Sequence, residues 1–158
     1  MKAEGSIKNG NIQGRIVWVG VTVMFTLLIF LQSSMNGTIS EKESMGFLNI
    51  INSFLIAIRF EKTVTHQMVR KAAHIIEYFI LGILHVLATA SDSRRVLIKQ
   101  FPRILLLTMT TALVDETIQL FVPGREGLVS DILLDCMSAF TGIFITSMFV
   151  SIAKKSEK

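Results

Sequence analysis

Cysteine, proline and charged residues are all scarce in this sequence. One cysteine and two prolines among 158 residues exclude a disulfide-stapled scaffold and a collagen-like chain. Charged residues make up only 18% of the chain, against about 25% in a typical soluble domain. With 51% hydrophobic residues, the chain is not intrinsically disordered either. Cys136 lies inside an apolar run and therefore says little about the redox compartment.

Apolar residues are abundant instead, and they exceed what the core of one small aqueous domain needs. Lysine and arginine outnumber aspartate and glutamate by 16 to 12. These basic residues lie mainly between and beside the apolar runs, as in membrane proteins, so we do not expect nucleic acid as a partner. The composition predicts an integral membrane protein in contact with membrane lipids.

Four apolar runs approach the length of about 20 residues that a membrane-spanning helix needs. They cover residues 16–35, 72–90, 104–122 and 128–153. Only the first is free of charged side chains, and a cleaved signal peptide is its alternative interpretation. We favour a retained helix, because its apolar core of sixteen residues, 16–31, is long for a signal peptide and no A-x-A-like cleavage site follows it. The prediction is an all-α, integral membrane four-helix bundle that forms one domain over residues 1–158.

The long connection between the first two runs contains apolar residues at helical spacing over residues 47–58. This segment is too short to span a bilayer. It predicts an extra amphipathic helix lying at the membrane interface.

The distribution of basic residues predicts the orientation. With the N-terminus in the cytoplasm, ten lysines and arginines fall inside and six fall outside, which agrees with the positive-inside rule. Both termini are then cytoplasmic, and the amphipathic helix belongs to the first extracytoplasmic loop.

This orientation brings most of the polar groups inside the spans to the outer leaflet. His74, Glu77 and Tyr78 are spaced i, i+3 and i+4 and share one helical face. The other members of the predicted constellation are Asp115, Glu116 and Gln119, then Asp131 and Asp135, with the cations Arg70, Lys71 and Arg125 nearby. Ionised carboxylates facing lipid are costly, so we expect them to surround a common pocket or to pair with the cations as helix-to-helix contacts.

The chemistry of such a pocket has two versions. Carboxylates with one imidazole suit a divalent cation, although no spacing matches a specific metal motif. Alternatively, closely spaced carboxylates share protons, and one of them acts as a general acid or as a proton relay.

Three ordered motifs of this sequence resemble the VanZ-like family of small membrane proteins. They are Arg70-Lys71-x-x-His74-x-x-x-Tyr78, then Asp115-Glu116-x-x-Gln119-x-x-x-Pro123-Gly124-Arg125, then Ser130-Asp131-x-x-x-Asp135 with Gly142. The resemblance covers about residues 15–150. It implies a multi-pass protein of the bacterial cytoplasmic membrane, and a role in low-level resistance to the lipoglycopeptide teicoplanin. Asparagine is common at position 135 in such relatives, which argues against an indispensable carboxylate ligand there.

Three functions remain open at this stage. The favoured one is an outward-facing pocket that binds a polar or anionic head group, with peptidoglycan precursors or the lipoglycopeptide as candidate partners. The alternative is a membrane hydrolase or transferase acting on a lipid-linked or glycolipid substrate. In that enzyme Asp115 or Glu116 acts as base or metal ligand, His74 as acid or base, and Arg125 as phosphate clamp. A proton-coupled carrier ranks last, because the polar cluster lies away from the membrane midplane.

Overall fold

The computed structural model describes residues 2–35, 45–46, 49–50, 52–53, 64–89 and 94–156. Side chains are described over residues 13–35, 45–46, 49–50, 52–53, 64–89 and 99–152. Within these residues the regular elements are α1 (Lys2–Ser33), α3 (His66–Thr89), α4 (Arg94–Leu120) and α5 (Val129–Ser156). The prediction of an all-α bundle of four helices is confirmed. The expected amphipathic helix at 47–58 lies largely outside the described residues, although residues 49–50 and 52–53 are helical.

The helices extend beyond the apolar runs that predicted them. Helix α3 begins at His66, six residues before its apolar run, and α4 begins at Arg94, ten residues before its own. The reason is that hydropathy marks the part of a helix suited to lipid, whereas the helix continues through polar residues. Pro102, expected near the helix entrance, therefore lies inside α4. Gly124 has a φ of 77° in the turn after α4, a conformation that favours glycine.

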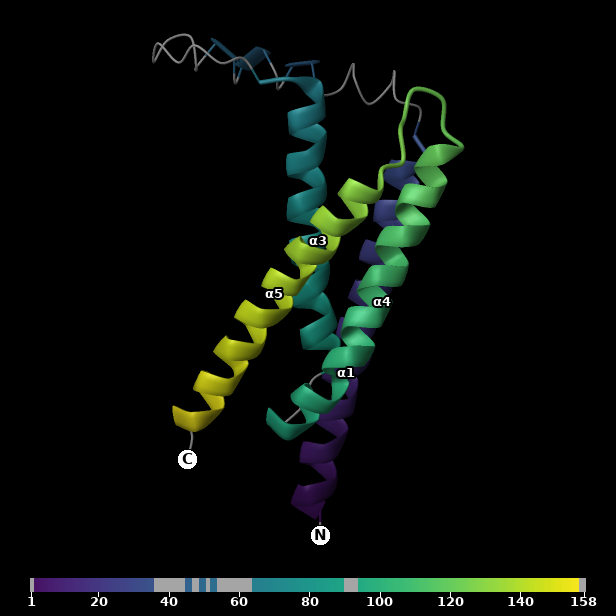
Figure 1. The fold of residues 1–158 in the computed structure, drawn as a ribbon. Helices are drawn as coiled ribbons and strands as arrows, with labels where there is room; N and C mark the ends of the chain where they lie inside the picture. The colour runs from purple at the N-terminus through teal and green to yellow at the C-terminus, as the bar shows by residue number, and fades with distance from the viewer. Residues whose placement is uncertain are drawn as a thin grey trace.

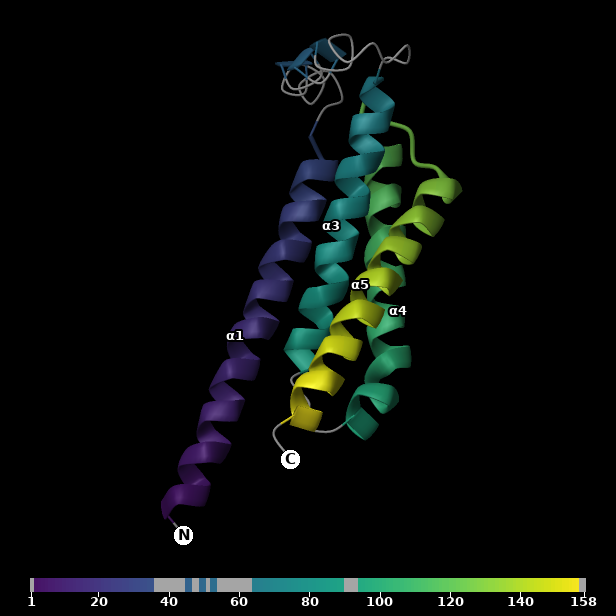
Figure 2. The same ribbon diagram turned by 90° about the vertical axis from the view of Figure 1, so that its left-hand side faces the viewer.

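Helix α3 occupies the centre of the bundle and contacts the other three (Figures 1 and 2). Both chain termini lie at one end of the bundle, and the α4–α5 loop lies at the opposite end. The closest approach joins α3 to α5. A Cβ atom on Gly82 would collide with the carbonyl oxygen of Ala139, and one on Gly142 with that of Phe79. Small residues at these two points let the helix backbones touch.

The outer surface of the bundle is apolar, and its interior combines apolar clusters with many buried polar side chains. Large hydrophobic side chains such as Leu31, Leu106 and Phe149 are exposed, whereas buried polar side chains outnumber buried apolar ones among the described residues. In the part of the chain that the structure describes, three helical stretches are long and apolar enough to cross a membrane: Gln13–Ser33, His66–Thr89 and Val129–Ile152. Helix α4 lies alongside them and carries the buried Asp115 and Glu116 in its apolar run. This arrangement is that of a helical membrane protein.

Candidate functional site

Four ionisable side chains from three helices meet inside the bundle. We call them the acid–histidine cluster: His74 of α3, Asp115 and Glu116 of α4, and Asp135 of α5. Each is buried, and one nitrogen or oxygen atom of each lies within 4.8 Å of the corresponding atoms of the others. Because α4 ends and α5 begins beside the α4–α5 loop, the cluster lies toward the end of the bundle opposite the termini (Figure 1). These four of the predicted site residues are therefore brought together.

The imidazole of His74 lies between two aspartates. Its Nδ1 is 3.7 Å from Oδ2 of Asp115 and 3.6 Å from Oδ2 of Asp135. These separations are too long for hydrogen bonds. Nδ1 of His74, Oδ1 of Asp115 and both carboxylate oxygens of Asp135 are buried without a hydrogen-bond partner. Such orphaned groups are rare in folded proteins, so each one demands an explanation.

Three neighbouring groups hold the cluster carboxylates in place. The Tyr78 hydroxyl donates a hydrogen bond of 3.2 Å to Oδ2 of Asp115. The Gln119 amide lies 3.4 Å from Oε1 of Glu116, and the backbone N–H of Leu128 donates to Oε2 at 2.8 Å. Tyr78 and Gln119, predicted as binding residues, thus contact cluster carboxylates, and a binding role for them stays a prediction.

Asp131 belongs to a separate ion pair at the edge of the cluster. It accepts a hydrogen bond of 2.7 Å from Nζ of Lys71, and Oδ2 lies 3.9 Å from Arg70. Here α3 and α5 are joined by paired charges, as expected for a helix-to-helix contact. Lys71 remains half-exposed, with 42% of its side chain accessible, so it can still meet a ligand from solution.

Arg125 links the α4–α5 loop to the end of α1. Its Nε donates to the carbonyl oxygen of Met35 at 3.0 Å, and its guanidinium donates a second bond of 2.9 Å to that of Gln32. Sequence analysis missed this contact, because backbone carbonyls carry no residue-type signal.

Glu77 is half-buried, and its side chain has no hydrogen-bond or ion-pair partner among the described residues.

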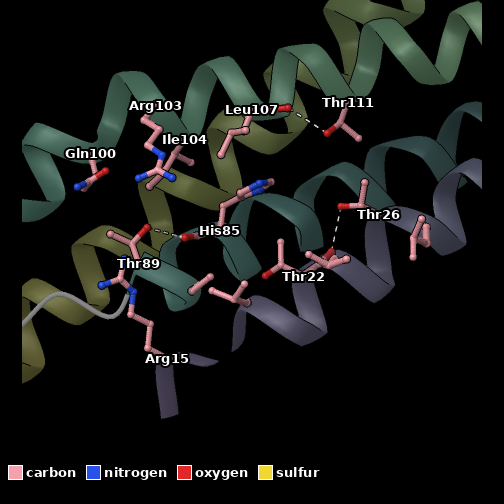
Figure 3. Close-up of a pocket in the computed structure, with 14 residues that line it drawn as sticks. Arg15, Thr22, Thr26, His85, Thr89, Gln100, Arg103, Ile104, Leu107 and Thr111 are labelled. Atoms are coloured by element: carbon pink, nitrogen blue, oxygen red, sulfur yellow. Dashed lines mark hydrogen bonds between the residues drawn. The ribbon is translucent and has the colours of Figure 1, made fainter. Parts of the chain in front are cut away.

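A separate cavity of about 410 Å³ lies between α1, α3 and α4, toward the end where the termini lie. Figure 3 shows Arg15, Thr22, His85, Thr89 and Arg103 around it. None of the predicted site residues lines this cavity, and sequence analysis did not anticipate it. Its lining residues come from one face of each of three helices, at the ordinary spacing of a helix face, and such spacing alone does not indicate that the three faces enclose a cavity.

The fold and the cluster define a membrane protein whose ionisable groups are enclosed by its own helices rather than exposed to lipid. A model of the VanZ/LLP1 family matches residues 17–150, which is most of the chain. The chain belongs to the VanZ/LLP1 family. Searches of curated proteins and of solved structures return no match.

Proposed function

We propose that this protein is a cell-envelope component of the bacterial cytoplasmic membrane. In this proposal the acid–histidine cluster and its cationic edge form an extracytoplasmic site for a polar or anionic head group. Binding there contributes to low-level resistance to glycopeptides such as teicoplanin. Family membership supports a link to glycopeptide resistance, and the bias of lysine and arginine supports cytoplasmic termini.

The observation that carries the proposal is the concentration of buried, partly unpartnered ionisable groups at one end of the bundle. Burying polar atoms without partners costs about 1–3 kcal/mol each. A purely structural contact gains nothing from leaving them unpaired, whereas a binding site satisfies its carboxylate oxygens when a ligand brings hydrogen-bond donors or positive charge to them. Lys71, half-exposed beside the cluster, supplies positive charge for an anionic group at the same level.

A membrane hydrolase or transferase is the second candidate, favoured by the position of His74 between Asp115 and Asp135. An imidazole close to carboxylates can serve as a general acid or base. This candidate differs from simple binding in one measurable respect. The purified protein would convert a lipid-linked phosphate or glycolipid, and the conversion would be lost in His74→Gln.

The resistance role is tested by expression in a teicoplanin-sensitive Gram-positive host. The wild-type chain is expected to raise the inhibitory concentration of teicoplanin, and Asp115→Asn to abolish that gain at equal membrane abundance. The asparagine side chain can still accept the bond from Tyr78, so the fold should persist while the charge is lost. Glu126→Gln is the matched control, because Glu126 is an exposed acid of the α4–α5 loop outside the cluster.

Equal protection by wild type and Asp115→Asn would show that the charge at this position is dispensable and would overturn the site assignment. Absence of protection by the wild-type chain would overturn the resistance role itself.

A further inference from the structure

We infer that the acid–histidine cluster is a binding site for one divalent metal ion, with ligands from His74, Asp115, Glu116 and Asp135. One imidazole nitrogen and three carboxylate oxygens lie within 4.8 Å of one another. Metal–ligand bonds of about 2.0–2.6 Å place ligands on opposite sides of an ion about 4–5 Å apart. The four donor atoms therefore fit around a single ion with only small side-chain adjustments.

The unpaired atoms of the cluster provide an independent reason. Asp135 is fully buried, and neither of its carboxylate oxygens has a hydrogen-bond partner. Nδ1 of His74 and Oδ1 of Asp115 are unpartnered at the same place. A cation satisfies all these lone pairs at once, which no single hydrogen-bond donor can do.

The charges lead to the same conclusion. Three buried carboxylates share one histidine, while the nearby Lys71 and Arg70 are directed at Asp131. A doubly charged ion would offset most of the negative charge that the cluster gathers in a low-dielectric interior. The bonds from Tyr78, Gln119 and the Leu128 N–H orient the ligands from outside, as is usual around metal sites.

The donor set indicates the class of ion. Imidazole favours zinc and related transition metals, whereas carboxylates suit harder ions such as manganese and magnesium. A mixture of one histidine and three carboxylates fits Zn²⁺ or Mn²⁺ better than Ca²⁺. The ion site stands without the proposed function, but its role in holding an anionic phosphate rests on that function. There the metal supplies the positive charge that an acidic pocket lacks.

The test measures metal content and affinity of the purified full-length protein, using Zn²⁺, Mn²⁺, Mg²⁺ and Ca²⁺ separately as probes. We expect one Zn²⁺ or Mn²⁺ per chain after dialysis, and binding weakened on the order of 10–100-fold or more in Asp115→Asn and Asp135→Leu. Asp135→Asn retains an oxygen donor and should lose less than Asp135→Leu. Glu126→Gln, which removes an exposed carboxylate of the α4–α5 loop outside the donor set, should bind as the wild type does.

A folded wild-type protein that retains none of the four ions would overturn the inference, as would Asp135→Leu binding with unchanged affinity. Circular dichroism checks that each variant is folded, and Asp135→Asn keeps the test decisive if the leucine variant fails to fold. Metal binding without teicoplanin protection would contradict the proposed function alone. Protection without metal binding would contradict the metal site alone.

The cavity of Figure 3 carries a second, independent inference: we propose that it holds an anionic phospholipid from the leaflet nearer the chain termini. Arg15 of α1 and Arg103 of α4 lie at one end of the cavity, near Thr89 and Gln100 (Figure 3). Neither guanidinium has a hydrogen-bond or ion-pair partner within the described part of the chain.

The rest of the cavity offers an apolar lining despite its threonines. The hydroxyls of Thr22, Thr26 and Thr111 each donate to a carbonyl oxygen one turn earlier in their own helix. These hydroxyls are therefore already satisfied, and the lining between them is supplied by Val19, Leu27 and Leu107. A cavity with cationic groups at one end and apolar walls along its length matches a phosphate head group followed by an acyl chain.

This second proposal is tested with protein reconstituted in nanodiscs of phosphatidylglycerol and phosphatidylcholine, then extracted in detergent and analysed for retained lipid. We expect the wild type to retain phosphatidylglycerol selectively. The amount of phosphatidylglycerol retained by the double variant Arg15→Gln/Arg103→Gln should be at least tenfold lower. Lys99→Gln removes an exposed cation one turn from Arg103 outside the lining and serves as the control. Equal retention of both lipids by the wild type, or unchanged retention by the double variant, contradicts the proposal.

Discussion

Gly82→Ala and Gly142→Ala are each expected to destabilise the protein strongly, and the double variant to fail to accumulate in the membrane. Each added methyl group would overlap a backbone carbonyl oxygen of the facing helix, that of Ala139 or that of Phe79. A backbone atom cannot rotate away, so α3 and α5 have to separate along their most extensive contact. Overpacking of this kind costs about 1–3 kcal/mol per site.

The matched control is Gly20→Ala on α1, where an added Cβ has no neighbour within 4 Å. Alanine favours a helix over glycine by about 1 kcal/mol, so this control should be neutral or stabilising. Thermal unfolding of the purified variants, followed by circular dichroism, measures the difference. If Gly82→Ala and Gly20→Ala unfold at the same temperature, the close α3–α5 packing is wrong.

Glu116→Ala is expected to destabilise the protein by about 1–3 kcal/mol, because it leaves a partly buried N–H without an acceptor. Oε2 of Glu116 accepts the bond from the Leu128 N–H, and the carbonyl oxygen of Leu128 in turn accepts the first bonds of α5, from Asp131 and Ile132. One carboxylate of α4 thus fixes where α5 begins. The same contact therefore sets the position of Asp135 along the bundle relative to Asp115.

Glu116→Gln separates this structural role from the charge of the side chain. The glutamine oxygen can still accept a hydrogen bond from the Leu128 N–H. The unfolding temperature of the Glu116→Gln variant should therefore stay close to that of the wild type. Both variants should bind Zn²⁺ or Mn²⁺ more weakly, since both remove a carboxylate ligand. Chemical denaturation in detergent, paired with metal titration, gives the two readouts. Equal destabilisation by alanine and glutamine would show that the Leu128 bond is not what Glu116 contributes.

The convergence of the polar residues was predictable from the sequence. The i, i+3, i+4 spacing on α3 and the alternating direction of the spans suffice to bring His74, Asp115 and Asp135 to one end of the bundle. The partition of the two aspartates on α5 was not predictable. Asp131 and Asp135 share a face, yet Lys71 engages Asp131 while Asp135 joins the cluster.

The different partners of Asp131 and Asp135 depend on how α3 and α5 cross. The glycine contacts set this crossing, and no residue pattern encodes it by itself. The starts of α3 and α4 were not predictable from the apolar runs either, because charged residues such as Arg70 and Arg94 lower hydropathy without ending a helix. The binding, catalytic and metal roles of the individual site residues stay predictions.

The enclosure of polar groups by apolar helix surfaces also constrains how the protein is made. Helix α4 carries two acids and a glutamine that are almost fully buried by its neighbours, and alone in lipid those groups would be strongly unfavourable. Its partners come from both sides in the chain, since α3 precedes it and α5 follows it. We therefore expect stable integration of α4 to wait until α5 has been synthesised. Biogenesis of this protein is expected to be a concerted event rather than a helix-by-helix insertion.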